Sequence, residues 1–320
     1  MNKFAKLFKK VGGKEILKRY ARAHVLVYAL FLSLWLGFSK KSLEILRNAV
    51  DNKILKKLRR KNKKFIAGYS ADDRSEPVNK SVEGRKIWVC WLQGMDNAPE
   101  LVKKCYQSMK EYITDREIIV LTEDNYRDYV VFPEYIQKKI DNGVITRTHM
   151  SDLLRTELLL QYGGTWIDAT VMITGSLPGY MLDSDLFFYQ CLKPGLDGHP
   201  TKISNWFISA EKNNRILRLT IELLYNYWKK YNKLIDYFIY HDFAELAIEK
   251  YPDEWNSVIP VSSSTPHILL LRLFDKYDEK TWNAIKSQTC VHKLTYKFEE
   301  EQKNQTGTYY DKLIKCYRYT

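Results

Sequence analysis

The chain has 320 residues, of which 45% are hydrophobic and 14% aromatic, so it can bury a sizeable core and is not disordered throughout. Its formal net charge is +13. Residues 1–64 hold 19 Lys and Arg against three acidic residues, a net charge of +16, and the remaining residues carry a net charge of −3. The positive charge therefore belongs to an N-terminal arm, and we expect no nucleic-acid partner for the nearly neutral body.

The cysteines indicate neither a zinc site nor a disulfide framework. They are widely separated, and no two of them form a CxxC pair. An odd count with this spacing is typical of reduced thiols in a cytoplasmic compartment. The five residues are Cys90, Cys105, Cys191, Cys290 and Cys316.

An uncharged apolar run occupies residues 23–39 and has basic residues on both sides. Its 17 residues lie at the lower limit for a membrane-spanning helix, and no convincing cleavage site follows that would indicate a secretory signal. We expect residues 1–68 to form a basic, helical arm that inserts apolar side chains into an anionic membrane surface, reinforced by the basic run at 53–64. The alternative is an apolar helix that packs against the body and leaves the lysines in solvent.

The body is expected to follow a polar, turn-rich linker at residues 69–84 and to extend over residues 85–320. Buried strands are predicted at 87–91 and 117–121, and Ala98-Pro99 opens a helix between them. Strand, helix and strand at this spacing form a βαβ unit. The sequence therefore predicts an α/β domain with a parallel sheet covered by helices on both faces.

A helix, a short strand and an acidic residue follow one another in the middle of the chain. Thr148 or Ser151 can cap the helix, and Gly163-Gly164 ends it, because glycine accepts the left-handed conformation common at helix ends. The strand is predicted at 165–167, and Asp168 stands at its carboxyl end. Ligands of open α/β sheets bind beyond such ends, so Asp168 is placed where chemistry is expected.

Asp152 and Arg155 lie three residues apart on that helix and therefore share one face. From spacing alone, a surface ion pair of little energetic value is an equally good interpretation. Asn205 is a polar residue inside a predicted apolar strand and needs a partner, which makes it a candidate for contact with a donor or acceptor. The later elements are expected as strands at 186–189 and 203–208, helices near 212–230, 233–250, 266–275 and 278–288, and a strand or loop at 290–297.

Two segments resemble bacterial capsular polysaccharide synthesis proteins. Residues 87–94 with Ala98-Pro99 resemble the start of that family, and Ser151-Asp-Leu-Leu-Arg155 followed by Tyr162-Gly-Gly-Thr-Trp-Ile-Asp-Ala-Thr170 resembles its central motif. The family is similar to the glycosyltransferases with a DxD sugar-binding motif (family 32-like). The resemblance covers roughly residues 85–300. It implies a GT-A fold, a Rossmann-like α/β domain that binds a nucleotide-sugar, with a mainly helical C-terminal part.

This resemblance implies transfer of a sugar from a nucleotide-sugar donor to an acceptor hydroxyl, with retention of configuration, in the synthesis of a bacterial capsular or surface polysaccharide. Together with the arm, it implies a lipid-linked or oligosaccharide acceptor and a location at the cytoplasmic face of the bacterial cell membrane. An anchored enzyme meets such an acceptor at high effective concentration. The alternative is a non-catalytic, membrane-bound adaptor of a polysaccharide-assembly complex that has kept the GT-A fold.

The resemblance also assigns roles to the motif residues. Asp168 matches the first aspartate of DxD and would touch the metal or the donor's ribose and sugar. Asp152 would accept hydrogen bonds from sugar hydroxyls, and Arg155 would hold the sugar or a phosphate oxygen with its fixed fork of donors. These three residues form the expected catalytic set. The other residues expected to contact the donor are Trp91, Gln93, Gly164, Asn205 and Lys293.

A divalent metal, Mn²⁺ or Mg²⁺, is expected to bridge the donor diphosphate and to stabilise the leaving group as its charge develops. Its expected ligands are Asp168, Thr170 and His292. Thr170 stands where the second aspartate of DxD is usual, so the sequence leaves metal dependence open. His292 is equally well interpreted as an ordinary loop histidine.

Overall fold

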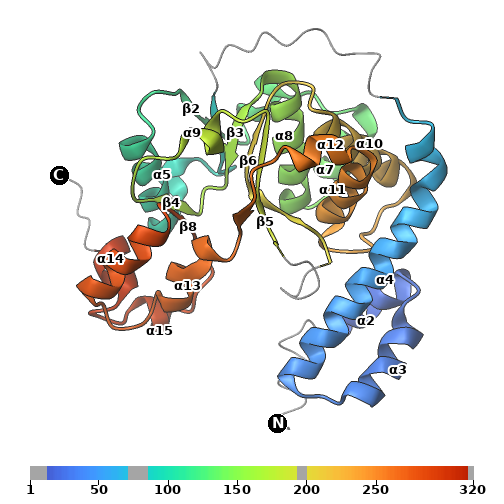
Figure 1. Ribbon diagram of the computed structural model, residues 1–320, viewed down its shortest axis with the longest axis horizontal. Coiled ribbons are helices and arrows are strands. Elements are labelled where there is room, and N and C mark those ends of the chain that lie inside the picture. The colour runs from blue at the N-terminus through green and yellow to red at the C-terminus, as the bar shows by residue number, and fades with distance from the viewer. Residues whose placement is uncertain (1–12, 71–85, 193–199, 316–320) are drawn as a thin grey trace.

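The computed structural model describes residues 13–70, 86–192 and 200–315. Its centre is a six-stranded sheet formed by β1 (Ile87–Cys90), β2 (Ile118–Leu121), β3 (Gly164–Ile167), β5 (Leu186–Gln190), β6 (Ile203–Ala210) and β7 (Val261–Ser262). The strand order is β2-β1-β3-β6-β5-β7. Figure 1 labels β2, β3, β6 and β5 of this sheet. Neighbours are parallel in β2-β1-β3 and in β5-β7, and antiparallel on both sides of β6.

The expected parallel sheet is thus correct for the first three strands and wrong around β6. Parallel neighbours need a crossover of a dozen or more residues, usually a helix, and α5 (Glu100–Tyr112) supplies one between β1 and β2. No helix lies in the described part of the connection from β5 to β6, and these two strands run antiparallel. A separate two-stranded sheet pairs β4 (Val171–Ile173) with β8 (Val291–Lys293).

Helices follow the strands and dominate the C-terminal part of the body. They are α6 (Tyr126–Tyr129), α7 (Glu134–Asp141), α8 (Arg147–Tyr162), α9 (Gly179–Leu182), α10 (Arg215–Lys230), α11 (Ile239–Lys250), α12 (Pro252–Asn256), α13 (Ile268–Arg272), α14 (Glu279–Gln288) and α15 (Glu300–Lys303). Short 3-10 turns lie at Met95–Asn97 and Thr265–His267, and a π-helical turn lies at Asp311–Lys315.

The core lies on both faces of the six-stranded sheet, because successive side chains of a strand point to opposite faces. Trp88 and Trp166 belong to an apolar cluster with α8, α10 and α11. Ile87 and Ile167 belong to a second cluster with α5 and β4 on the other face. The predicted α/β architecture, with helices on both faces of the sheet, is therefore confirmed.

One helix begins later than its sequence pattern predicts. The pattern favoured a helix over 233–250, but residues 231–238 form a loop between α10 and α11. The hydroxyl of Tyr227 holds this loop, because it donates to the carbonyl of Lys233 at 2.6 Å and accepts from the backbone N–H of Ile235 at 2.8 Å. A side chain of the preceding helix therefore satisfies backbone groups that a helix would otherwise use.

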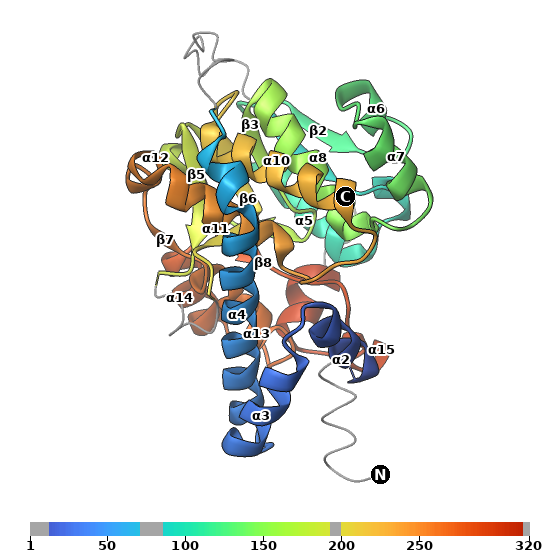
Figure 2. The same cartoon turned by 90° about the vertical axis from the view of Figure 1, so that its right-hand side faces the viewer.

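The arm consists of α2 (Gly13–Arg22), α3 (Leu26–Leu36) and α4 (Lys40–Ala67), and it packs on the body (Figure 2). Ser39 begins α4, since its hydroxyl accepts from the backbone N–H of Ser42 at 3.0 Å. Further along α4, Ile54 and Leu58 lie in the same apolar cluster as α10 and α11. Arg59 donates to Glu249 of α11 at 2.8 Å. The arm is therefore helical, as expected, and shares a core with the body.

The short helix α3 packs against α4 and leaves its opposite side in solvent. Val27, Phe31, Leu34 and Trp35 are 82%, 62%, 75% and 83% exposed. The alternative prediction for residues 23–39, an apolar helix that packs against the rest of the protein, is therefore correct for only one side of α3. The other side is exposed. None of the helices in the described ranges has the length and apolarity needed to cross a membrane. The linker predicted at 69–84 falls outside these ranges except for its first two residues.

Candidate functional site

The candidate site lies at the edge of the sheet where the parallel strands β1 and β3 end. Asp168 follows β3 directly, and its backbone N–H donates to the carbonyl of Trp206 on β6 at 2.9 Å. A tight turn then leads into β4, with the N–H of Val171 donating to the carbonyl of Asp168 at 2.9 Å. Val171 pairs with Lys293 on β8. The pairing of β4 with β8 therefore brings a lysine from the C-terminal part to the end of β3.

The carboxylate of Asp168 is held from three sides. The ammonium of Lys293 donates to Oδ2 at 2.9 Å, and the indole N–H of Trp166 donates to Oδ1 at 2.9 Å. The guanidinium of Arg155 lies 3.6 Å from Oδ1. Burial disfavours the charged form, but Lys293 and Arg155 outweigh it and hold the pKa of Asp168 below its ordinary value. Asp168 is therefore an ionised carboxylate, and 26% of its side chain remains exposed to solvent.

Arg155 is buried and fixed by contacts with several elements. It donates to the carbonyl of Ser151 at 3.1 Å and to the hydroxyl of Ser151 at 3.0 Å, and it also donates to the backbone carbonyl of Asn205. Its guanidinium lies 4.9 Å from the centre of the Trp166 ring. The guanidinium therefore has one position relative to the sheet edge.

Asp152 is the second carboxylate of the site and lies one helical turn before Arg155. It accepts from the side-chain amide of Asn205 at 2.8 Å, and Arg155 lies 3.4 Å away. Nδ1 of His149 lies 3.5 Å from its other oxygen. Asp152 and Arg155 are only 6% and 5% exposed, so the interpretation as a surface ion pair is wrong. Asn205 has the partner that its place in an apolar strand required.

Trp91 and Gln93 follow β1 at this same edge, because β1 and β3 run parallel. The ring of Trp91 packs edge-on against Tyr296 with ring centres 5.2 Å apart. Its indole N–H is buried and has no hydrogen-bond partner among the described residues. Gln93 is exposed. Gln93 is therefore accessible to a ligand at the edge, whereas the N–H of Trp91 is buried and lacks an acceptor in the described part of the chain.

Gly164 does not lie in the site, and the expectation that it contacts the donor is corrected. It is the first residue of β3, at the opposite end of the strand from Asp168. Its φ is +95°, and a Cβ added there would lie 2.3 Å from the carbonyl oxygen of Lys86. Glycine is required here for the close approach of two backbones, which is a packing role.

His292 does not face the site either, which corrects its expected role as a metal ligand. It precedes Lys293 on β8, and successive side chains of a strand point to opposite faces. Its Nε2 lies 2.9 Å from the hydroxyl of Thr174, and its ring lies 5.4 Å from that of Trp282. Burial lowers the pKa of His292 to about 4, so the ring is neutral at physiological pH.

The remaining expected metal ligands, Asp168 and Thr170, do lie together. The ammonium of Lys293 donates to both, at 2.9 Å to the carboxylate and at 2.6 Å to the hydroxyl. The described part of the chain contains no group of three His, Cys, Asp or Glu side chains that could hold a metal ion. A divalent cation between these oxygens would meet the lysine charge, which costs free energy. The protein ligands alone therefore do not fit a metal ion here.

Residues 36–313 match the model of the capsular polysaccharide synthesis protein family, which is most of the chain. The chain belongs to this family.

Two curated relatives match part of the chain. An O-glycosyltransferase, PaGT, from Phomopsis amygdali is 23% identical over 172 residues, which cover 48% of this chain and 41% of the relative. An O-glycosyltransferase, braB, from Annulohypoxylon truncatum is 24% identical over 163 residues, which cover 45% of this chain and 38% of the relative. The chain thus spans about two-fifths of the length of these relatives. The solved PaToxG glycosyltransferase is 15% identical, with a TM-score of 0.39 over 66% of this chain and 83% of that chain.

Three residues of this family member belong to the site although the sequence analysis did not name them as site residues. Trp166 lies on β3 two residues before Asp168, which directly follows that strand, so the alternation of side chains could have identified it. His149 and Ser151 lie one helical turn before Asp152 and Arg155, respectively, so helical spacing could have identified them.

Proposed function

We propose that the protein is a glycosyltransferase with a GT-A-type fold that transfers a sugar from a nucleotide-sugar donor to an acceptor hydroxyl in the synthesis of a surface polysaccharide. The observation that carries the proposal is the alternation of charges at the sheet edge. Asp152, Arg155, Asp168 and Lys293 form one connected, buried to half-buried network. Membership of the capsular polysaccharide synthesis family and relatives named as O-glycosyltransferases support it.

The network suits a reaction in which a nucleotide diphosphate leaves the sugar. Negative charge grows on the diphosphate as the glycosidic bond breaks, and fixed positive groups aimed at it stabilise that charge without reorganising. We assign this role to Lys293 and Arg155. Asp168 and Asp152 keep the two cations in position and accept hydrogen bonds from the donor's hydroxyls. Trp91 and Gln93 would contact the base. These assignments rest on the contacts described above.

Retention of configuration and a lipid-linked or oligosaccharide acceptor are parts of the same proposal. Both rest on the resemblance, and no residue is assigned as a nucleophile. The metal expected from the resemblance, Mn²⁺ or Mg²⁺, stays a prediction. It would need oxygens of the donor diphosphate to complete its ligands, because Asp168 is the only carboxylate among its expected protein ligands.

We also propose that the arm attaches the protein to the cytoplasmic face of a bacterial membrane. The apolar side of α3 that includes Phe31 and Trp35 would enter the interface. The lysines that follow it, such as Lys40 and Lys41, would lie near anionic headgroups, where each is worth about 1 kcal/mol. Flotation with vesicles tests this attachment, and Phe31→Ser with Trp35→Ser should abolish it. Unchanged flotation of that variant would contradict the attachment.

A thermal-shift screen of nucleotide-sugars, with and without Mn²⁺, tests the function. A donor at about 100 times its Kd should stabilise the fold by about 2.7 kcal/mol. The stabilisation should be lost in Asp168→Asn, and its dependence on Mn²⁺ tests the metal prediction. If no donor stabilised the protein under either condition, the function as a non-catalytic adaptor would be favoured instead.

A further inference from the structure

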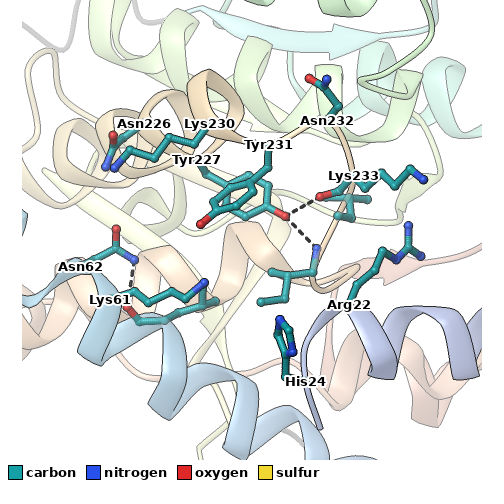
Figure 3. A pocket seen from close by; sticks show the side chains of 13 residues that line it. Arg22, His24, Lys61, Asn62, Asn226, Tyr227, Lys230, Tyr231, Asn232 and Lys233 are labelled. Carbon is teal, nitrogen blue, oxygen red and sulfur yellow. Dashed lines mark hydrogen bonds between the residues drawn. The ribbon is translucent and has the colours of Figure 1, made fainter. Parts of the chain in front are cut away.

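A pocket of about 630 Å³ lies between the arm and the body, lined by residues of both. Its cations come from four different segments (Figure 3). Arg22 ends α2, Lys61 belongs to α4, Lys230 ends α10, and Lys233 belongs to the loop that follows α10. This pocket takes no part in the donor site described above.

The charged side chains that line the pocket are all basic, although Glu15 lies near Arg22 and Lys233 just outside the lining. The apolar part of the lining comes from Leu58, Tyr227, Tyr231, Leu234 and Ile235. Besides the four cations, the lining contains the side-chain amides of Asn62, Asn226 and Asn232, and no carboxylate is present among its described residues. A cleft lined by charges of one sign concentrates ligands of the opposite sign. Ammonium, guanidinium and amide groups are the donors that phosphate oxygens accept from. The chemistry of the lining therefore indicates a phosphate group as the ligand.

The carbonyl ends of α10 would oppose an anion here, since the C-terminus of a helix carries partial negative charge. Lys139 reduces this conflict, because its ammonium donates to the carbonyl of Tyr231 at 2.9 Å and also to that of Trp228. The loop that closes the pocket is also held in place. The Tyr227 hydroxyl bonds to the backbone of Lys233 and of Ile235, as the dashed lines in Figure 3 show. These contacts within the protein thus preform the pocket in the absence of a ligand.

An exposed apolar surface follows the pocket closely along the chain. Arg22 and His24 line the pocket, and α3 starts two residues later. The exposed side of α3 runs from Val27, which is 82% exposed, to Trp35, which is 83% exposed. At 1.5 Å per residue this side is roughly 12 Å long. A basic pocket followed by an apolar strip is complementary to a molecule with a phosphate head and a hydrocarbon chain.

We propose that the pocket binds the phosphate head group of a lipid whose hydrocarbon chain lies along the exposed side of α3. The proposal deepens the membrane attachment proposed above and rests on it. The loop at 231–238 connects this pocket to the donor site, because Ile235 lines the pocket while the ring of Tyr237 lies 5.5 Å from that of His149 beside Asp152. A lipid head group in the pocket is thus connected by one short loop to the sugar-transfer site.

The test is binding of the full-length protein to vesicles of neutral phosphatidylcholine, with and without a few per cent of a polyprenyl phosphate. We expect binding to require the phosphate lipid and to weaken at least about tenfold in the triple variant Lys61→Gln, Lys230→Gln, Lys233→Gln. A matched variant removes three charges from exposed positions of the body, outside both the arm and the pocket, Lys110→Gln, Lys276→Gln and Lys280→Gln. It should bind nearly as well as the parent protein. Equal losses in the two variants would overturn the pocket as the site.

A second experiment, without vesicles, distinguishes a lipid ligand from free phosphate. Calorimetric titration with inorganic pyrophosphate should show weak binding that depends on the pocket lysines. The double variant Leu34→Ser, Trp35→Ser should bind pyrophosphate as the parent protein does. The same α3 variant should lose most of its vesicle binding. If pyrophosphate bound as tightly as the lipid, the lipid assignment would be wrong. Donor binding in the thermal-shift screen is measured separately, so failure of the pocket proposal and failure of the glycosyltransferase proposal are distinguishable.

Discussion

The ammonium group of Lys293 lies 2.9 Å from the carboxylate of Asp168, although 125 positions separate the two residues in the sequence. The antiparallel pairing of β4 with β8 creates this contact. It joins the motif in the middle of the chain to the C-terminal part, and it leaves the carboxylate ionised. Neither the central motif nor the C-terminal segment is a complete site without the other.

Asp168→Asn should lower sugar transfer at least about 100-fold, because it removes the charge that holds Lys293 and Arg155 in place. Transfer or slow donor hydrolysis, followed by release of the nucleotide, measures the effect. The matched control is Asp253→Asn, an exposed carboxylate on α12. An Asp168→Asn protein that melts normally and keeps full activity would remove Asp168 from the site.

Lys293→Met should change the pH dependence of activity as well as its size. Lys293 lowers the pKa of Asp168, so the carboxylate is present above a low pKa and is lost only when the pH falls through it. Without the lysine the pKa of Asp168 rises, and the acidic limb of the kcat/KM profile should move to higher pH. A lysine that only supported the fold would leave the position of this limb unchanged.

Gly164→Ala should destabilise the protein by about 2–4 kcal/mol, because the new Cβ would meet the Lys86 carbonyl in a backbone conformation that L side chains rarely adopt. Gly143→Ala is the matched control. Gly143 also has a positive φ, +68°, but nothing lies within 4 Å of its added Cβ, so a cost of only about 1 kcal/mol is expected. Urea unfolding measures both. Similar costs for the two variants would show that the close approach does not matter.

Asp51 of α4 should make the fold less stable as the pH rises. Burial and the nearby Asp236 raise its pKa to about 7, which outweighs the attraction of Arg19 and Arg47. Asp242, whose own pKa is also raised by burial, faces the same cluster. A carboxyl with a raised pKa in the folded state binds more protons than in the unfolded state. Its contribution is therefore complete below about pH 4 and lost as the pH rises towards 7.

Asp51→Asn should accordingly raise the free energy of unfolding by roughly 1–3 kcal/mol at pH 8 and change it little at pH 4. Urea unfolding at the two pH values measures this. Glu44→Gln, an exposed carboxylate on the same helix, should have little effect at either pH. A loss of stability at pH 8 in Asp51→Asn would show that the charged form is favourable in the fold.

The sequence predicted the parts of the site that local rules decide. Asp168 stands at the end of a short apolar strand, and the spacing of Asp152 and Arg155 places them on one helix face. Whether that pair is buried depends on β6, which contributes Asn205 from fifty residues further along the chain. Spacing on one helix contains no information about that neighbour. A surface pair was therefore an equally good interpretation before the fold was known.

The predicted roles of His292 and Gly164 were wrong for geometric reasons. His292 and Lys293 were both assigned to the site, but they are neighbours on one strand and cannot both face it. The sequence left open whether this segment was a strand or a loop. Gly164 was grouped with the motif that ends in Asp168, but a four-residue strand of about 13 Å separates its two ends.

The helix α4, with 28 residues and a length of about 42 Å, joins the exposed side of α3 to the body by packed side chains. A membrane attachment through α3 would therefore hold the candidate site, at the edge of the sheet, at a fixed distance from the bilayer. Only acceptors whose terminal sugar reaches that distance would be extended. The length of the arm would then select acceptors by their length, and acceptors that are too short or too long would be poor substrates whatever their terminal sugar.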